Sequence, residues 1–181
     1  MELVRTLKHV ESLTLGASCI EVLAQREKRR IRFPISTYQC VTLNIHMKED
    51  GLLGTVNLLK GSRGLQMLII DMESKFWEEP KNTELADSEN FCISNYLVSQ
   101  AKHVKCLLHH LKTVKITQFV DEHSIFQFLE FILKNGRVLE NLVIIAKRDQ
   151  GENSPESLLK VAQRLLSLPR ASSRAVVTFL N

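Results

Sequence analysis

The sequence lacks the features that mark several common classes of protein. Its four cysteines are far apart and form no C-x-x-C pair, so they predict neither a structural zinc site nor a disulfide framework. No apolar run approaches the ~18 residues that cross a bilayer, and residues 1–13 have no apolar signal-peptide core. We therefore expect a protein of the cytoplasm, the nucleus or both, with no membrane partner, whose cysteines are small buried apolar residues.

The charge is too weak to identify a nucleic-acid-binding protein. The 181 residues are 44% apolar and 24% charged, as is typical of a globular domain, and the formal net charge of +4 is spread along the chain. The densest basic run is Arg26–Arg32 (REKRRIR), which fits a nuclear-import signal or a nucleic-acid patch but is more often a solvated face. A nucleic-acid partner is therefore not expected.

Residue groups that bind cofactors or metals are also missing. The glycines at positions 51, 54, 61 and 64 have neither the spacing nor the following Lys-Ser/Thr of a phosphate-binding loop. Cys106, His109 and His110 supply only three of the roughly four ligands of a zinc site. We expect them to enter a strand, where the two histidines would point to opposite faces. We therefore expect no metal and no cofactor.

A catalytic arrangement is not indicated either. Asp121, His123 and Ser124 include the residue types of a triad, but near neighbours at a helix start cannot converge as a triad requires. The alternative class, an α/β hydrolase or transferase, needs a nucleophile or a phosphate cradle on a loop after a strand. The sequence shows neither, so we expect a protein that is not an enzyme.

What the sequence does have is a repeated strand pattern. The spacing apolar-x-x-apolar-x-apolar occurs in five full copies, which start at Val10, Cys40, Leu65, Leu111 and Leu139, and in a shortened copy at 177–179. The middle apolar residues stand at positions 13, 43, 68, 114, 142 and 177. Four of the five gaps lie at or somewhat above the ~20–29 residues of a leucine-rich repeat, and the gap of 46 requires an insertion. One or two copies arise by chance, whereas five favour a repeat.

The segments between these strands have helical periodicity. The clearest helix follows the strand at 111–116 and ends at Gly136, which is free to adopt a positive φ. Its apolar stripe consists of Ile125, Phe128, Leu129, Ile132 and Leu133. We predict an α/β fold, a leucine-rich-repeat-like solenoid of βα units with a parallel sheet that forms the C-terminal part of a horseshoe.

The first strand of the predicted solenoid would have an uncovered edge. Each strand of a solenoid pairs with the strand before it, and a terminal unit needs a polar outer cap. Only nine residues precede the first copy of the pattern at Val10. We therefore expect an exposed strand edge and a chain that tends to self-associate.

Five short motifs follow one another between residues 77 and 173. They are Trp77–Pro80 (WEEP), Cys106–Ile116 (CLLHHLKTVKI), Phe126–Gly136 (FQFLEFILKNG), Val138–Leu142 (VLENL) and Leu165–Ser173 (LLSLPRASS). Their order and distances resemble the FBD domain of plant F-box proteins with leucine-rich repeats. The resemblance implies leucine-rich-repeat units over residues 1–76 and an FBD-like domain over residues 77–181 that continues the solenoid.

The resemblance implies only part of that family's function. Members usually begin with an F-box, a helical segment that docks on a Skp1-type adaptor of a cullin ubiquitin ligase, and nothing in residues 1–76 looks like it. What remains implied is a non-catalytic protein-interaction module, the substrate-recognition half of an SCF-type ligase subunit. A Skp1-type adaptor is a partner only if an F-box lies upstream. The alternative is a truncated remnant that competes for partners without binding the adaptor.

The surface left for a protein partner is the outward side of the predicted strands. In the repeat pattern the apolar residues point inward and the residues between them point to the open side of the sheet. The candidate partner-binding residues are Thr42, Asn44, Met67, Ile69, Thr113, Lys115, Asn141 and Val143. This mixed polar and apolar set suits a protein or peptide, while the alternative that these are solvated sheet positions stays open.

Overall fold

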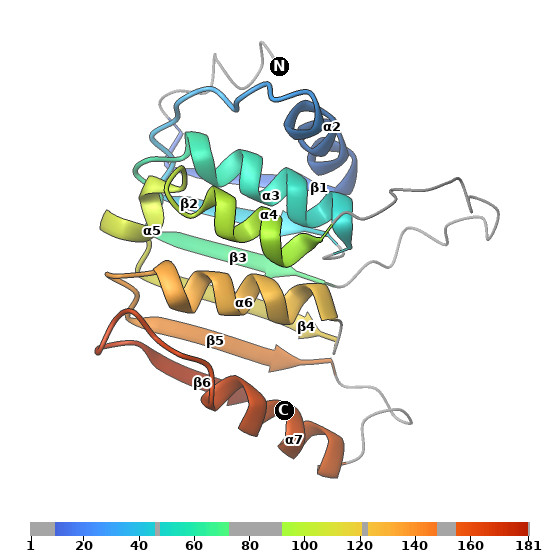
Figure 1. Ribbon diagram of the computed structural model, residues 1–181, viewed down its shortest axis with the longest axis vertical. Coiled ribbons are helices and arrows are strands. Elements are labelled where there is room, and N and C mark those ends of the chain that lie inside the picture. Colours follow the sequence, from blue (N-terminus) through green and yellow to red (C-terminus); the bar gives the residue numbers. More distant parts are fainter. Residues whose placement is uncertain (1–9, 46–47, 73–91, 121–122, 148–154, 181) are drawn as a thin grey trace, which may run out of the picture.

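The computed structural model describes residues 10–45, 48–72, 92–120, 123–147 and 155–180 (Figure 1). The Trp77–Pro80 motif, Asp121 and residues 1–9 lie outside these ranges, and what we expect of them stays a prediction. Within the described ranges, no helix is both long and apolar enough to span a bilayer.

Six parallel strands form one sheet in the order of the sequence. They are β1 (Ser12–Gly16), β2 (Cys40–Asn44), β3 (Met67–Asp71), β4 (Thr113–Phe119), β5 (Asn141–Ala146) and β6 (Val176–Leu180). Each strand pairs with its neighbours in the chain, so all six begin at the same edge of the sheet. The predicted α/β class, a parallel sheet of leucine-rich-repeat-like βα units, is confirmed, while the horseshoe and self-association stay predictions.

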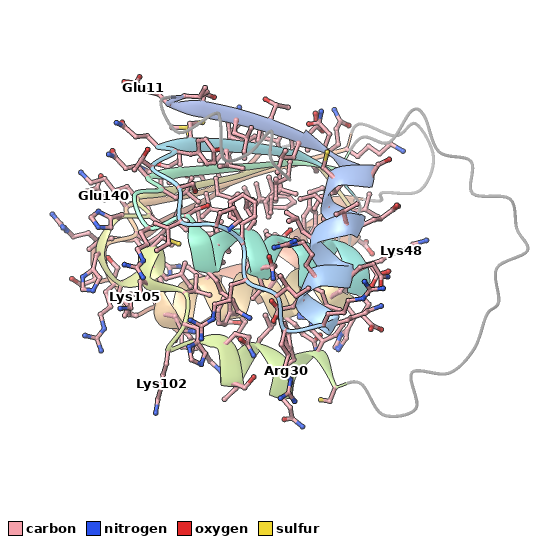
Figure 2. All side chains as sticks on the ribbon, turned by 90° about the horizontal axis from the view of Figure 1, so that it is seen from above. Glu11, Arg30, Lys48, Lys102, Lys105 and Glu140 are labelled. Carbon is pink, nitrogen blue, oxygen red and sulfur yellow. The ribbon has the colours of Figure 1, made fainter. Side chains whose placement is uncertain are left out.

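The helices lie against one face of this sheet. They are α2 (Ala17–Lys28), α3 (Glu49–Gly61), α4 (Ile93–Gln100), α5 (Lys105–His109), α6 (His123–Asn135) and α7 (Pro155–Leu166). Parallel neighbours need a crossover connection, and every crossover here contains a helix. Figure 2 shows the sheet on one side and the helices on the other, with side chains between them. None of the described helices covers the other face.

The inward residues of the strands form a column, with one correction. The register aligns Leu13, Val41, Leu68, Val114, Leu142 and Val177. Leu43 was predicted in this column but lies two residues further along β2, paired with Leu15 and Ile70. The second copy therefore starts at Tyr38, which is fully buried, and not at Cys40. An aromatic ring can fill an interior position as a leucine does, but a search for leucine-like residues does not count tyrosine and therefore missed Tyr38.

Helix α6 is buried as its apolar stripe predicts. Ile125, Phe128, Leu129 and Ile132 are fully buried and Leu133 nearly so. The reason for Gly136 is different from the predicted one, because this glycine has no positive φ. A Cβ atom there would lie 2.7 Å from the Ile132 carbonyl oxygen, so the position is restricted by space.

The cysteines are all free, but only one is buried. Cys106 is inaccessible to solvent, as predicted. Cys19 and Cys92 are exposed and Cys40 is half-exposed on the outward side of β2, so the prediction was wrong for these three. Composition and spacing contain no information on which side of a helix or strand a single cysteine takes.

Candidate partner-binding surface

The outward residues of the strands form rows across the open face of the sheet. The first row is Ser12, Cys40, Met67, Thr113, Asn141 and Val176. The second row is Thr14, Thr42, Ile69, Lys115, Val143 and Thr178. A third row contains Asn44, Asp71 and Thr117, beyond which a bulge in β4 shifts the pairing with β5. Strand spacing of about 4.8 Å brings side chains within a row into contact range.

All eight predicted residues lie on this open face. Met67, Thr113 and Asn141 are in the first row, and Thr42, Ile69, Lys115 and Val143 are in the second. Thr42 and Asn44 are on the face but each is one row away from its predicted place, because the register of β2 differs by two residues. Side chains alternate between faces with a period of two, so this error changed the row and left the face unchanged.

Sequence reasoning missed several residues of the face. Cys40 was taken as an inward residue, and Val176 and Thr178 belong to the shortened last copy, from which no outward residue was chosen. Asp71 and Thr117 follow the predicted strand ends. The signal that could have found Cys40 is the nearly constant gap of 28 and 27 residues between Leu13, Val41 and Leu68.

The two ends of the face differ in chemistry. The outward residues of β1 and β2 are small and mostly polar, whereas β3, β5 and β6 present apolar side chains. Met67 is 39% exposed and Val176 is 57% exposed. Leu180 is 46% exposed and completes the apolar end. Exposed apolar area of this kind favours contact with a protein over contact with water.

Lys115 is the charged group within the second row. Its direct neighbours across the strands are Ile69 and Val143. It is half-buried, and within the described residues its ammonium group has no ion pair or hydrogen bond. A cation with apolar neighbours on both sides can pair with a carboxylate of a partner in a partly desolvated contact.

The residues considered for metal binding or nucleophilic chemistry do not form a reactive site. The prediction that Cys106, His109 and His110 enter a strand was wrong. They belong to the short helix α5 and its end. Cys106 is buried while both histidines are exposed, and burial raises the pKa of the Cys106 thiol to about 12. A thiol with this pKa stays protonated and is a poor nucleophile. In the described ranges, no three or more His, Cys, Asp or Glu residues are grouped to hold a metal.

A partly buried charged network of described residues lies on the helix side, away from the open face. Glu27 of α2 accepts hydrogen bonds from Asn57 Nδ2 at 2.7 Å and from Lys60 Nζ, both on α3. Burial raises the pKa of Glu27, but the hydrogen bonds from Lys60 and Asn57 outweigh it and lower this pKa below 4.5. The Lys60 ammonium lies 5.8 Å from the ring centroid of Tyr96, whose pKa is raised by burial and by the charge of Glu27. The network joins three helices, which is a structural role.

Comparison with known proteins points to one family. Residues 99–144 match the FBD family model. The chain is 23% identical over 147 residues to an F-box/LRR-repeat protein of Arabidopsis thaliana, an alignment that covers 80% of this chain. The chain spans 30% of the length of that relative. No solved structure matches the chain at a significant level.

The family match begins at the end of α4 and covers α5, β4, α6 and most of β5. It lies inside the predicted FBD-like domain, whose boundaries at 77 and 181 stay a prediction. Both similarities were expected from the short motifs between Trp77 and Ser173. The predicted resemblance is therefore confirmed: residues 99–144 match the FBD family, and most of the chain is similar to a plant F-box/LRR-repeat protein.

Proposed function

We propose that this chain is a non-catalytic recognition module that binds a target protein on the open face of its sheet. In an SCF-type ubiquitin ligase such a module would hold the protein to be ubiquitinated. The observation that carries the proposal is the second row of the face, in which Ile69, Lys115 and Val143 lie side by side without a described helix over them. A partner residue set there would gain apolar contact and an ion pair at once.

The relative's name supports the family part of the proposal. It describes an F-box/LRR-repeat protein, and the chain covers 30% of that protein. We assign residues 1–76 to leucine-rich-repeat units and residues 77–181 to an FBD-like domain, and we place the protein in the cytoplasm, the nucleus or both. A Skp1-type adaptor is a partner only of a protein that also contains an F-box.

The test compares partner capture by two matched variants expressed in the native tissue. The face variant combines Ile69→Asp, Val143→Asp and Lys115→Glu. The control variant makes the same chemical changes on the helix side, with Val22→Asp, Val98→Asp and Arg29→Glu, all at exposed positions. Thermal unfolding of both purified variants checks that they remain folded.

Three outcomes separate the possibilities. A protein that co-purifies with the wild type and the control but not with the face variant supports the proposal. Equal recovery with all three chains would eliminate the open face as the binding site. The second candidate is a competitor that lacks adaptor binding. Recovery of the target without a Skp1-type adaptor favours it, when the cells express this chain and no longer form of the protein with an F-box.

A further inference from the structure

The topology places four separate segments at one edge of the sheet. Because all strands are parallel and follow one another in order, the residues before β3, β4, β5 and β6 lie at the edge where the strands begin. These segments are 62–66, 101–112, 136–140 and 167–175. In Figure 2, Lys102, Lys105 and Glu140 are labelled on this side of the molecule, opposite Lys48.

The four segments are strongly basic. They contain seven Lys or Arg residues and a single carboxylate, that of Glu140. Their net charge is thus +6, whereas all other described residues together hold 12 Lys or Arg and 8 Asp or Glu residues, a net charge of +4. These four short segments therefore carry more net positive charge than all other described residues together.

Most of these cations have no ion-pair partner among the residues that the structure describes. Two are engaged: Lys112 Nζ lies 3.8 Å from Glu140 Oε1, and Arg170 Nη1 donates to the Ala175 carbonyl oxygen at 3.0 Å. The other five are exposed and make no ion pair with a described residue. We call these five the cationic edge: Arg63, Lys102, Lys105, Arg137 and Arg174.

The segments that carry the cationic edge are packed against the core and hydrogen-bonded to one another. Val104, Cys106 and Leu107 are fully buried beneath Lys102 and Lys105. Backbone hydrogen bonds link the segments, from Arg137 N to Leu107 O at 3.0 Å and from Lys112 N to Gln66 O at 2.9 Å. The cost of ordering these segments is therefore met on folding, which favours binding by a preorganised surface.

We propose that the cationic edge binds an acidic segment of a protein partner. Clustered like charges repel one another, and a partner with the opposite charge relieves this repulsion and is steered to the surface. An extended acidic peptide laid across the strand starts, which are about 4.8 Å apart, meets cationic side chains before each of four consecutive strands. This surface is separate from the open face, and the inference goes beyond the proposed function.

A nucleic acid fits the cationic edge less well. Single-stranded binders stack bases on aromatic side chains, and the four segments contain no Phe, Tyr or Trp. Duplex readers place a helix or a ribbon in the groove, and the one helix in these segments, α5, has five residues. An acidic peptide needs neither feature.

The experiment measures binding of a labelled peptide of alternating glutamate and serine to the purified chain by fluorescence anisotropy. The edge variant is Arg63→Gln with Lys105→Gln and Arg137→Gln. The matched control is Lys48→Gln with Lys147→Gln and Lys160→Gln, which removes the same charge from exposed side chains that do not precede a strand. We expect about tenfold weaker binding for the edge variant and less than about twofold for the control, as three lost surface ion pairs imply.

Every other outcome overturns the proposal. Equal losses in the two variants would mean that the peptide responds to net charge alone. No measurable binding at about 50 mM salt, where electrostatic attraction is least screened, would mean that the edge is a solvated surface. Tighter binding of duplex DNA than of the peptide, lost in the same edge variant, would assign the surface to nucleic acid.

Discussion

Helices α3 and α6 have the same length of 13 residues and both lie against the sheet, but different forces hold them. Helix α6 buries seven apolar side chains, three of them phenylalanines. Helix α3 also buries Asn57 and places Lys60 against Glu27 of α2. Helix α6 is thus held mainly by apolar packing, and α3 by polar contacts as well.

The close approach of α2 explains the difference. A Cβ atom at Gly54 of α3 would lie 2.3 Å from the Ile20 carbonyl oxygen of α2, so the two backbones nearly touch there. With α2 on one side and the sheet on another, α3 is buried nearly all round, and its polar residues must find partners. Two helices that cover the same sheet are thus held by different interactions, so different substitutions should destabilise them.

The largest effect is expected from a cavity under α6. Phe128 is fully buried, so Phe128→Ala removes a large apolar volume and leaves a hole that the rigid neighbours fill poorly. The free energy of unfolding should fall by about 3–5 kcal/mol. Urea unfolding followed by circular dichroism measures it, with the exposed Lys134→Ala as control, which should change it by less than about 0.5 kcal/mol. A loss below about 1 kcal/mol would show that apolar volume does not hold α6.

The next largest effect tests the close approach of α2 and α3. Gly54→Ala adds a methyl group where no space exists and should cost about 3 kcal/mol, although alanine is the better helix former. Gly64→Ala is the matched control, because the nearest atom to its added Cβ lies 3.8 Å away. The same urea titration measures both variants. A stabilised Gly54→Ala protein would mean that the backbones are further apart than described.

The charged network should make stability depend on pH. Glu27→Gln removes the carboxylate that Lys60 and Asn57 hold and should cost about 2 kcal/mol at pH 7. The pKa of Glu27 is lowered from 4.5 in the folded protein, so its stabilisation is present above pH 4.5 and is lost as the pH falls through the lowered value. Unfolding midpoints at several pH values should therefore converge for wild type and variant on acidification. Parallel curves would contradict a role for the ionised carboxylate.

The smallest effect is expected at the end of α2 and has the opposite sign. Arg30 has a φ of 57°, and its N–H donates to Glu27 O at 2.8 Å while that of Ile31 donates to Arg26 O at 2.8 Å. This is the double hydrogen bond of a helix end at which glycine is usual. Arg30→Gly should stabilise the protein by about 1 kcal/mol, whereas Arg29→Gly, at a φ of −87°, should not. Differential scanning calorimetry compares the two melting temperatures.

The strand pattern was sufficient to predict most of the fold and the candidate face. Apolar residues that alternate along Leu68–Ile70 and Val114–Ile116 have to point to one side, and the residues between them to the other. The wrong placement of Leu43 did not matter for the face, since a shift by two residues keeps the side. It arose because Cys40 satisfies an apolar pattern as well as Tyr38 does.

The wrong expectation for His109 and His110 has a physical reason too. The residues that lead into β4 form the short helix α5, in which Cys106 and Leu107 are buried while His109 and the following His110 are exposed. A run as short as this shows no clear period, so contact with the rest of the protein decides its structure. The exposed Cys19 and Cys92 show the same limit for single residues.

The local elements of this protein follow from its sequence pattern, whereas contacts between distant segments follow from its tertiary structure. Alternation within a few residues determined strands, helices and the outward side, because side-chain direction is a local property of the backbone. The Glu27–Lys60 contact spans 33 residues, and the cationic edge gathers residues from four segments. Only the tertiary structure could decide these, because distance in space between such residues depends on how the strands stack and not on any spacing in the chain.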